Sequence, residues 1–501
     1  MSKAFYVTTP IYYPNAEPHT GHAYTTIIAD IIARWKRLEG YDVFFLTGTD
    51  EHGLKLQRAA LERGLQPKEF VDMMVEKFKE AWKALRIEYS RFIRTTDADH
   101  EELVKNLLME LWKKGLIVKG KYAGWYCTSC EKFFSEGEYV EEEGRKLCPI
   151  HMKELEWVEE ETYFLKLSKF QDYVLKVLSE TDVVYPKEYV REVVSKLRLE
   201  GLKDLSITRP KSRVFWGIEA PWDRNHTIYV WIDALLNYLT GIKLLKDKEF
   251  FSKYWSEAHH IIGKDILWFH TIIWFALLKM IGIPPPKKVV VHGFVLMGGK
   301  KMGKSTGNVV TIDELLKDFD ADVVRYCLMR VMSLDKDIEF TFENMVDMHN
   351  NELADILGNL VRRLGVLSKK KLGGVVSKDS IDEELRREAE RTIEAVRESM
   401  NKFRFSEALV KIFDLFRYLN AYLNKTEPWK KEKPNYELYN AIEGLRFGVT
   451  LLWSFMPYTC EKIAKVFDFK IETIDKLVFG KSEKFVVTEV PLLFKKIKKK
   501  K

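Results

Sequence analysis

Residues 4–48 read AFYVTTPIYYPNAEPHTGHAYTTIIADIIARWKRLEGYDVFFLTG. The run 4–9 is rich in β-forming residues, the apolar residues of 23–38 recur with helical spacing, and 41–48 is almost wholly apolar. Gly40 fits the position that follows a helix C-terminus. A strand, a glycine-containing loop, a helix and a buried strand make a βαβ unit, which predicts a parallel sheet.

The rest of the chain divides into three segments that differ in composition and hydrophobic periodicity. Residues 288–293 predict a further buried strand, followed by a glycine-rich loop at 297–305. Residues 119–221 are rich in charge and short strand-like runs, which predicts an insertion into the sheet domain. From 312 onward, apolar stripes with helical spacing predict a helix bundle. The predicted fold class is therefore α/β, a Rossmann-like parallel-sheet domain split by an insertion and followed by an all-α bundle.

Bulk properties narrow the class of protein. A chain of 501 residues suggests several domains, and 46% hydrophobic with 31% charged residues is typical of a globular protein. The net charge of +7 permits a polyanionic partner without requiring one. No secretory signal and no bilayer-spanning run is visible. Five cysteines, three of them clustered, do not suggest a disulfide framework. We expect a soluble, cytoplasmic protein.

The cysteine cluster is the strongest local signal. Two pairs with the same spacing, Cys127 with Cys130 and Cys148 with His151, offer three thiolates and one imidazole. These ligands favour tetrahedral Zn²⁺, and four protein ligands leave no open position for catalysis. The alternative is a redox CxxC pair with an unrelated Cys148 and His151. We predict one structural zinc that holds together an insertion too small for its own core.

A second signal lies at the predicted strand-to-helix junction, where His19 and His22 flank Gly21. The histidines could bind a metal, pack against the helix, or bind an anion, because free backbone N–H groups and the helix dipole favour anions there. A basic loop with Lys301 and Lys304 follows the strand at 288–293. Loops at the carboxyl ends of parallel strands share one crevice, so both could face one ligand. Taken singly, each pattern is more often structural.

Together and in this order, the two patterns resemble the HIGH and KMSKS signatures of the class I aminoacyl-tRNA synthetases. The first reads HTGH at 19–22, with threonine for isoleucine, and the second reads KMGKS at 301–305, with glycine for serine. The resemblance implies catalytic roles for His19, His22, Lys301 and Lys304. It implies that ATP is bound by these four residues together with Gly21, Met302, Gly303 and Ser305, and that Mg²⁺ accompanies the ATP.

Within that class, the chain resembles the methionyl-tRNA synthetase family over nearly its whole length. Similar blocks are TTPIYY at 8–13, LTGTDEHG at 46–53, YVWIDAL at 229–235, IGKDILWFH at 262–270, NLVRR at 359–363 and EPW at 427–429. The resemblance implies a methionine site formed by Pro10, Ile11, Tyr13, Asp50, Trp231, Ala234, Leu235, Tyr238, Ile266 and His270. A thioether packs well against aromatic rings, and Asp50 suits the substrate ammonium. Without the flanking blocks, Trp231 and Tyr238 would be interpreted as side chains of the hydrophobic core.

The reaction implied is methionine–tRNA ligation for protein synthesis, with methionyl-adenylate as the intermediate and L-methionine, ATP and tRNA(Met) as substrates. Trp429 suits stacking on an anticodon base, while Asn359 and Arg363 share one helix face and offer hydrogen bonds to base edges. For Arg363 a solvated surface position is an open alternative. The chain carries no run resembling the β-barrel module that some relatives append, so we expect a monomer.

The resemblance also implies domain boundaries. The halves of the catalytic domain are 1–118 and 222–325, the inserted connective domain with the zinc ligands is 119–221, the linker that contacts the tRNA stem is 326–349, and the anticodon-binding domain is 350–501. Two rival functions remain open at this point. One is a class I synthetase for leucine, isoleucine, valine or cysteine, and the other is a catalytically silent paralogue that only binds tRNA. A nucleotidyltransferase acting without RNA fits the helical last third poorly.

Overall fold

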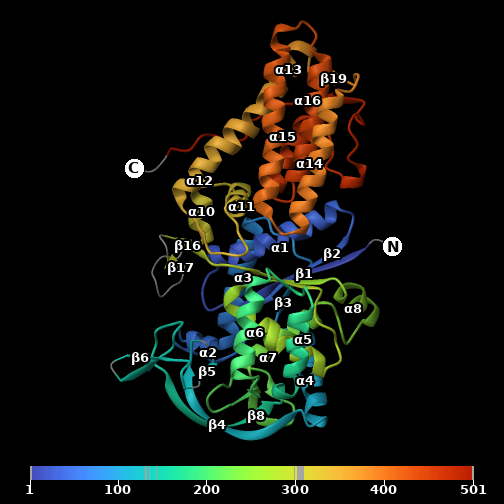
Figure 1. Cartoon of the computed structure of the whole chain (residues 1–501). Coiled ribbons are helices and arrows are strands. Elements are labelled where there is room, and N and C mark those ends of the chain that lie inside the picture. Colours follow the sequence, from blue (N-terminus) through green and yellow to red (C-terminus); the bar gives the residue numbers. More distant parts are fainter. Residues whose placement is uncertain are drawn as a thin grey trace.

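The computed structural model describes residues 3–129, 132–134, 136–142, 144–297, 300–301 and 310–498. Within these ranges, six strands pair in parallel as the sheet β3-β2-β1-β14-β15-β9 at the centre of the molecule (Figure 1). In that order the strands are β3 (Arg91–Arg94), β2 (Asp42–Thr49), β1 (Ala4–Tyr12), β14 (Ala258–Gly263), β15 (Lys288–His292) and β9 (Val184–Tyr185). The parallel sheet predicted from the βαβ pattern is confirmed.

Helices cover both faces of this sheet. The helical elements up to residue 280 are α1 (Thr20–Leu38), α2 (Leu54–Leu61), α3 (Pro67–Ala84), α4 (Ala98–Lys113), α5 (Gln171–Glu180), α6 (Glu188–Glu200), α7 (Val230–Gly241), α8 (Lys248–Trp255), the 3₁₀ turns η1 (Leu167–Phe170) and η2 (Lys264–Ile266), the π-helix η3 (Phe269–Ile273) and α9 (Trp274–Met280). Alternate residues of β1 point to opposite faces. Phe5 and Val7 enter a core shared with α1, whereas Tyr6 enters one shared with α4 and α7.

The segment between α4 and α7 is largely antiparallel. One sheet has the order β10-β8-β4-β5, another has the order β11-β13-β12, and β6 and β7 form a hairpin. The strands are β4 (Ile117–Cys127), β5 (Lys132–Phe134), β6 (Val140–Glu142), β7 (Arg145–Leu147), β8 (Glu156–Leu165), β10 (Leu205–Ser206), β11 (Thr208–Pro210), β12 (Glu219–Ala220) and β13 (Asp223–Ile228). The insertion is confirmed, and it also supplies β9, one of the two outer strands of the central sheet. Its limits of 119 and 221 stay a prediction.

A small sheet, β17-β16-β18, leads from the central sheet to the helical part of the chain. Its strands are β16 (Val295–Met297), β17 (Lys300–Lys301) and β18 (Ile338–Glu339), and the helices α10 (Ile312–Asp318) and α11 (Ala321–Arg330) lie between them in sequence. The helical part then comprises α12 (Phe342–Met348), the π-helix η5 (His349–Gly358), α13 (Asn359–Leu372), α14 (Glu383–Asn401), α15 (Phe405–Thr426), η6 (Pro428–Lys430), α16 (Asn435–Leu452), α17 (Pro457–Val466) and η7 (Ile474–Lys476), with β19 (Val375–Ser377) paired to β20 (Lys484–Val486).

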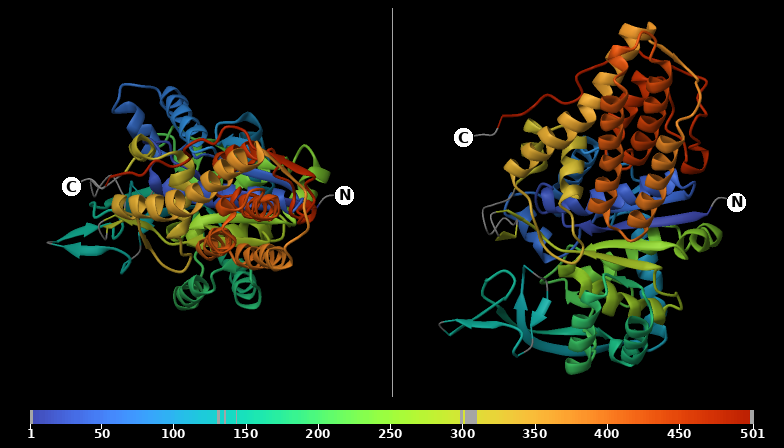
Figure 2. Two further views of the ribbon diagram at one scale, coloured as in Figure 1. Left: turned by 90° about the horizontal axis from the view of Figure 1, so that it is seen from above. Right: turned by 45° about the horizontal axis from the view of Figure 1, so that its top comes forward.

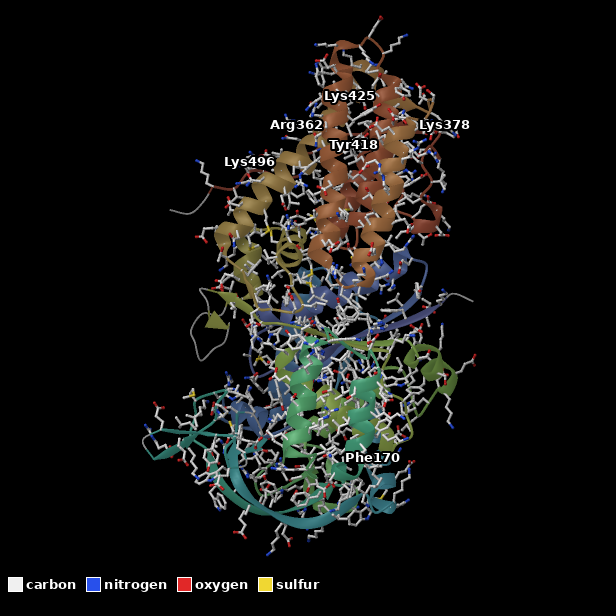
Figure 3. All side chains as sticks on the ribbon, viewed as in Figure 1. Phe170, Arg362, Lys378, Tyr418, Lys425 and Lys496 are labelled. Carbon is white, nitrogen blue, oxygen red and sulfur yellow. The ribbon has the colours of Figure 1, made fainter. Side chains whose placement is uncertain are left out.

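The helical bundle and the insertion lie on opposite sides of the central sheet (Figures 1 and 2). Figure 3 places Lys425 near the outer end of the bundle and Phe170 toward the opposite end of the molecule. No helix within the described ranges combines the length and the apolar character that crossing a bilayer requires.

A buried ionic cluster joins α1 to the bundle. Arg325 of α11 lies 2.7 Å from Asp30 of α1, and Arg34 donates to the same carboxylate at 2.8 Å. Arg325 also donates to the backbone carbonyls of Ser454 and Phe455, which follow α16. All three charged side chains are fully buried. Burial alone would raise the pKa of Asp30, but the two guanidinium groups hold it below its usual value. Arg34 also pairs with Glu88 at 3.1 Å, so the two guanidinium groups face two carboxylates, and the cluster ties the two parts together.

Candidate functional site

The site is built where the strand order reverses. The chain passes from β1 to β2 on one side and later returns as β14 on the other side, so β1 lies between the two halves of the sheet. In open parallel sheets, ligands bind outside the carboxyl ends of the strands at such a point. The predicted site residues of the first half, Pro10, Ile11, Tyr13, His19, Gly21, His22 and Asp50, all lie at or just after the ends of β1 and β2.

His19 and His22 cap the N-terminus of α1. Nδ1 of His19 accepts a hydrogen bond from the backbone N–H of Gly21 at 3.0 Å, and Nδ1 of His22 accepts one from the backbone N–H of His19 at 3.1 Å. Because each Nδ1 is an acceptor, the neutral form of each ring carries its proton on Nε2. The ring centroids lie 3.9 Å apart. The pair therefore offers two N–H donors at a helix N-terminus.

Burial keeps His22 neutral. It lowers the pKa of His22 well below its usual value, and the neighbouring His19 and Lys55 lower it further. The ring also packs against Tyr12 and Phe78, at centroid distances of 5.0 and 5.7 Å. Gly21 is required because a Cβ there would lie 2.8 Å from Cε1 of His19. The glycine thus makes room for the histidine ring itself.

Thr20, which departs from the signature, ties α1 to the chain that follows the basic loop. Its hydroxyl donates to the carbonyl of Val310 at 2.7 Å, and its backbone N–H donates to the same oxygen at 3.2 Å. His19 and Thr311 form an isolated antiparallel bridge. Lys301 ends β17, and its side chain, like Met302, Gly303, Lys304 and Ser305, lies outside the described residues. The described residues that follow the loop, Val310 and Thr311, therefore lie against the first motif.

The second half of the site is aromatic. Trp231, Ala234, Leu235 and Tyr238 come from α7, Ile266 from η2 and His270 from η3. The Tyr238 hydroxyl lies 2.7 Å from Nε2 of His270, and Nδ1 of His270 lies 3.0 Å from the carbonyl of Ile266. The carbonyl can only accept, so Nδ1 carries the proton and Nε2 accepts from the tyrosine hydroxyl. Burial lowers the pKa of His270 to about 4, so the ring stays neutral.

Packing holds this half in place. The Trp231 ring stacks on Phe269 at 3.8 Å and meets His270 edge-on at 6.2 Å. Tyr238 stacks on His260 at 4.1 Å, and His260 in turn is bonded to Thr8 of β1 at 2.9 Å. Asp50 follows β2 directly and is buried, with its backbone N–H bonded to the carbonyl of Tyr12. Aromatic side chains suit an apolar amino-acid side chain, and a carboxylate suits its ammonium group.

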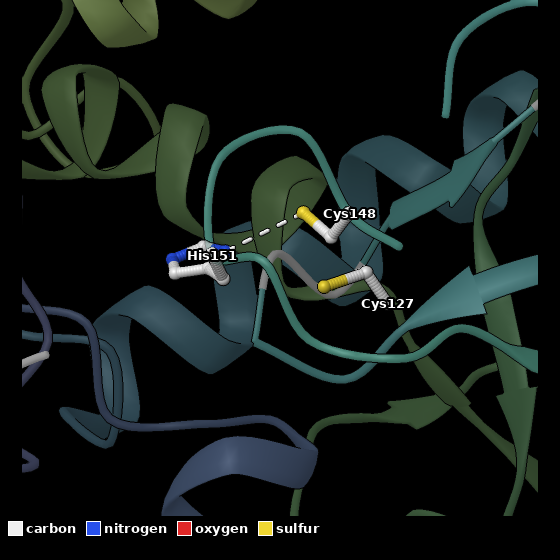
Figure 4. A group of neighbouring side chains, drawn as sticks. All are labelled: Cys127, Cys148 and His151. Carbon is white, nitrogen blue, oxygen red and sulfur yellow. Dashed lines mark hydrogen bonds between the residues drawn. The ribbon is translucent and has the colours of Figure 1, made fainter. Parts of the chain in front are cut away.

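Three of the four predicted metal ligands converge in the insertion. The ligand atoms of Cys127, Cys148 and His151 all lie within 4.8 Å of one another, and Cys148 Sγ is 3.7 Å from His151 Nδ1 (Figure 4). A tight turn closes around them, with the backbone N–H of Met152 bonded to the carbonyl of Cys148 at 2.8 Å. Cys130 lies outside the described residues. Two thiolates and an imidazole at this spacing fit a zinc ion.

The predicted anticodon residues lie together on the helical bundle. Arg363 of α13 reaches Asn420 and Asn424 of α15, at 3.2 and 2.7 Å. Its guanidinium carbon lies 5.6 Å from the centre of the Trp429 ring, which is 38% exposed. Asn359, one turn before Arg363, donates to the carbonyl of Asp355. An exposed indole with an arginine beside it is a typical platform for an unpaired base.

One cavity of about 560 Å³ lies elsewhere, between the end of α1 and α17, and Arg37, Trp453, Lys465 and Phe469 contribute to its lining. It is separated from the histidine pair by nearly the whole of α1, roughly 27 Å at 1.5 Å per residue. It is therefore not part of the site described above.

The sheet, the paired histidines and the basic loop together define a class I tRNA synthetase. The family model described as "tRNA synthetases class I (M)" matches residues 5–365, and the one described as "Anticodon-binding domain of tRNA ligase" matches residues 382–501. A methionine–tRNA ligase of Caldanaerobacter subterraneus is 44% identical over 495 residues, 96% of this chain and 76% of that protein. One from Thermotoga maritima is 42% identical over 476 residues, 93% of this chain and 75% of that protein.

Solved structures give the same result. The methionyl-tRNA synthetase of Mycobacterium tuberculosis in complex with methionyl-adenylate has a TM-score of 0.94 at 36% identity, covering 98% of this chain and 99% of that one. The free-state structure of the Mycobacterium tuberculosis enzyme has a TM-score of 0.86 at 33% identity, covering 100% and 99%. The chain belongs to the methionine–tRNA ligase family.

Sequence reasoning missed a set of buried polar residues that contact the predicted site residues or adjoin them in the chain. His52, His100 and Asp233 meet in the interior, and Thr8 and His260 support Tyr238. A signal was available for Asp233, because an acidic residue inside the apolar run YVWIDAL has to find a buried partner. No pattern in the sequence points to the partners, which lie 181 and 133 positions away.

Proposed function

We propose that this chain activates L-methionine with ATP and transfers it to the terminal adenosine of tRNA(Met). The observation that carries the proposal is the pair of Nε2–H donors at the N-terminus of α1, close in sequence to the carboxyl end of β1, together with the aromatic side chains of α7 and η3. The family of the chain supports the same reaction.

In the first step, the methionine carboxylate attacks the α-phosphorus of ATP in line and pyrophosphate leaves. Asp50 accepts hydrogen bonds from the ammonium group, while Trp231 and Tyr238 pack on the thioether. His19 and His22 donate from Nε2 to phosphate oxygens as charge develops on them, and Lys301 and Lys304 neutralise the departing pyrophosphate. Positioning and charge stabilisation suffice, without a covalent enzyme intermediate. Mg²⁺ bound with the ATP supplies further neutralisation of the phosphates.

The pocket would select methionine by its shape and by the hydrogen-bonded pair of Tyr238 and His270. His270 is held neutral with Nε2 accepting from Tyr238, so no charged group faces the substrate side chain from this pair.

In the second step, the 2′-hydroxyl of the terminal adenosine attacks the activated carbonyl. Pro10, Ile11, Tyr13, Ala234, Leu235 and Ile266 complete the pocket, and Gly21, Met302, Gly303 and Ser305 complete the ATP site.

We also propose one zinc ion per chain, held by Cys127, Cys130, Cys148 and His151. Two buried sulfurs and a converging imidazole support this assignment. With four protein ligands the ion would stabilise the insertion and take no part in the reaction.

Anticodon bases would be bound by Arg363, Asn359 and Trp429. The chain would act as a monomer.

The proposal is tested by ATP–pyrophosphate exchange with purified zinc-loaded protein, run separately with methionine, leucine, isoleucine, valine and cysteine. Exchange with methionine alone is the expected result. Exchange with another amino acid instead would keep the ATP roles and remove the pocket assignment. No exchange with any of the five would leave tRNA binding without catalysis as the function.

A further inference from the structure

Three buried side chains that the reaction above does not use meet behind the methionine pocket. Nδ1 of His52 lies 2.7 Å from one carboxylate oxygen of Asp233, and Nε2 of His100 lies 2.8 Å from the other. His52 follows β2, His100 lies in the first turn of α4 and Asp233 in the first turn of α7. Their side chains are at most 4% exposed. Each carboxylate oxygen is thus engaged by one imidazole.

The positions of these residues in the chain link the two halves of the substrate site. His52 lies two residues after Asp50, the proposed ammonium ligand. Asp233 lies on α7 between the pocket residues Trp231 and Ala234. His100 contacts α7 a second time, because its Nδ1 lies 2.9 Å from the hydroxyl of Thr240, two helical turns beyond Asp233. The cluster therefore fixes the Asp50 segment and α4 against the helix that forms the pocket.

The charges in this region are matched. Burial alone would raise the pKa of Asp233, but His52 and His100 hold it below its usual value. Burial would lower the pKa of His52, but the Asp233 carboxylate, with smaller effects of Glu101 and Glu51, raises it. Glu51 is itself paired with Arg94 at 2.7 Å, and Glu101 with Lys105 at 3.0 Å.

Since those two acids have cations of their own, Asp233 is the carboxylate that faces His52 at hydrogen-bonding distance. A buried hydrogen-bonded pair of this kind holds its geometry firmly, because separating it would leave polar groups without a partner in the interior.

We propose that Asp233, clamped by His52 and His100, is a positioning residue that sets the distance between the ammonium site at Asp50 and the side-chain pocket on α7. This inference rests on the proposed function. An amino acid must satisfy both halves at once, so a shift between them weakens methionine binding and reduces discrimination against shorter side chains. ATP binding at α1 is unaffected, because His19 and His22 are held by their own backbone bonds.

The direct test is Asp233→Asn, which keeps the shape but places an amide group against two imidazoles. We expect the KM for methionine in ATP–pyrophosphate exchange to rise roughly 10-fold or more, the scale on which small misplacements reduce rates. The KM for ATP should stay at the wild-type value. The ratio of kcat/KM for methionine to that for leucine should fall. Methionine binding measured by tryptophan fluorescence without ATP gives an independent readout.

Paired histidine variants keep the test valid if Asp233→Asn folds poorly. An asparagine amide lies near the position of imidazole Nδ1 and a glutamine amide near that of Nε2. His52→Asn and His100→Gln therefore retain a donor to Asp233, whereas His52→Leu and His100→Leu do not. We expect the donor-retaining variant of each pair to recover most of the methionine affinity that the leucine variant loses.

Glu443→Gln, which breaks the buried Glu443–Arg446 pair of α16, serves as the control for destabilisation alone. It should lower the melting temperature without changing the KM for methionine. If Asp233→Asn and the leucine variants behave like this control, the positioning role is wrong and the cluster is purely structural. If the wild-type protein shows no methionine-dependent exchange at all, the proposed function fails instead, and the two failures are thus distinguishable.

Discussion

His19 and His22 each turn Nδ1 toward a backbone N–H and leave Nε2–H as the donor of the neutral ring. Such a donor is useful only if the ring keeps its proton on Nε2, and the capping bonds fix this choice before any substrate binds. The low pKa of His22, caused first by burial, keeps the ring neutral at physiological pH. In the proposed reaction, His22 would therefore stabilise phosphate charge by hydrogen bonding and not by carrying positive charge itself.

Replacing His22 by asparagine should remove the Nε2 donor while keeping an acceptor for the capping bond from His19. Loss of one such donor typically costs about 10²- to 10³-fold in rate. We expect that loss in the exchange rate, with the KM for methionine unchanged and the same ratio to wild type at pH 6.5 and pH 8. His22→Gln, whose amide lies near Nε2, is the matched control and should retain more activity. Equal losses in both variants would contradict the hydrogen-bonding role.

His259 gives a pH-dependent prediction away from the site. Burial lowers its pKa to about 4 from the usual 6.5, and its ring packs against Phe5 at 4.5 Å. The unfolded chain then binds a proton at higher pH than the folded chain does. Stability is consequently full above about pH 6.5 and falls as the pH drops toward about 4. At pH 5 this one group should reduce the free energy of unfolding by about 2 kcal/mol.

The check is the difference in urea midpoint between pH 7.5 and pH 5. His259→Asn retains a donor for the carbonyl of Glu257, to which the ring is bonded at 2.9 Å, but cannot titrate. Its midpoint should therefore depend less on pH than that of the wild-type protein. An unchanged pH dependence would show that other groups cause the acid sensitivity.

Among the structural elements, the turn that carries Cys148 and His151 shows how a short segment is held without a large core. Cys127 and Cys148 lie in a small cluster with Phe134 and Leu155, against which Trp125 packs. So few apolar side chains cannot order a hairpin and two turns alone, so the metal ligands have to contribute.

Cys148→Ser should lose the bound zinc, because serine is a poor ligand for this soft site. We expect about one zinc per chain in the wild-type protein by atomic emission and much less in the variant. Fluorescence of Trp125 and Trp157 should report unfolding of the insertion at lower temperature in the variant. Thr128→Ser, a conservative change at a neighbouring half-buried position, should leave the zinc content and the fluorescence unchanged. Full zinc retention in Cys148→Ser would contradict the assignment.

Elements with a local signature could be predicted from the sequence. The βαβ unit followed from periodicity over 4–48, and the paired spacing of cysteine and histidine predicted a cluster that the structure forms in part. Strand β9 could not be predicted, because two residues carry no periodicity and pair with β15 only through the tertiary fold. The same holds for His52, His100 and Asp233, whose meeting depends on how α4 and α7 pack.

For the molecule as a whole, the Asp30–Arg325 tie connects the helix of the histidine pair with the end of α16. Ions buried in this way are costly to break from one side, because the remaining charge loses its partner. The catalytic part and the helical bundle should therefore unfold together in the wild-type protein.

Arg325→Met should destabilise the chain by about 3 kcal/mol or more, since Asp30 and two backbone carbonyls lose a donor. Scanning calorimetry should then resolve two transitions where the wild type shows one. Arg417→Met, which removes an exposed pair with Asp414, should change stability by less than about 1 kcal/mol. A single transition in Arg325→Met would mean that the tie does not couple the two parts.

A variant of Trp429 tests whether tRNA binding at the helical bundle is separate from methionine activation at the central sheet. Trp429→Ala should raise the KM for tRNA(Met) in aminoacylation by roughly 10- to 100-fold, the equivalent of one lost base stack. ATP–pyrophosphate exchange with methionine should be unchanged, because the bundle and the site at β1 are separate parts of the molecule. The exchange assay is thus an internal control. Unaltered tRNA kinetics would remove Trp429 from the anticodon contact.

The strand order has a consequence for how the protein is made. Strand β1 ends at Tyr12, but its neighbour β14 begins only at Ala258. At about 5–20 residues per second, a ribosome needs roughly 12 to 50 s to synthesise the segment between them. During that time one edge of β1 has no strand to pair with, and such an edge is a template for aggregation. We therefore expect the nascent chain, before β14 is synthesised, to need protection from aggregation such as chaperones provide.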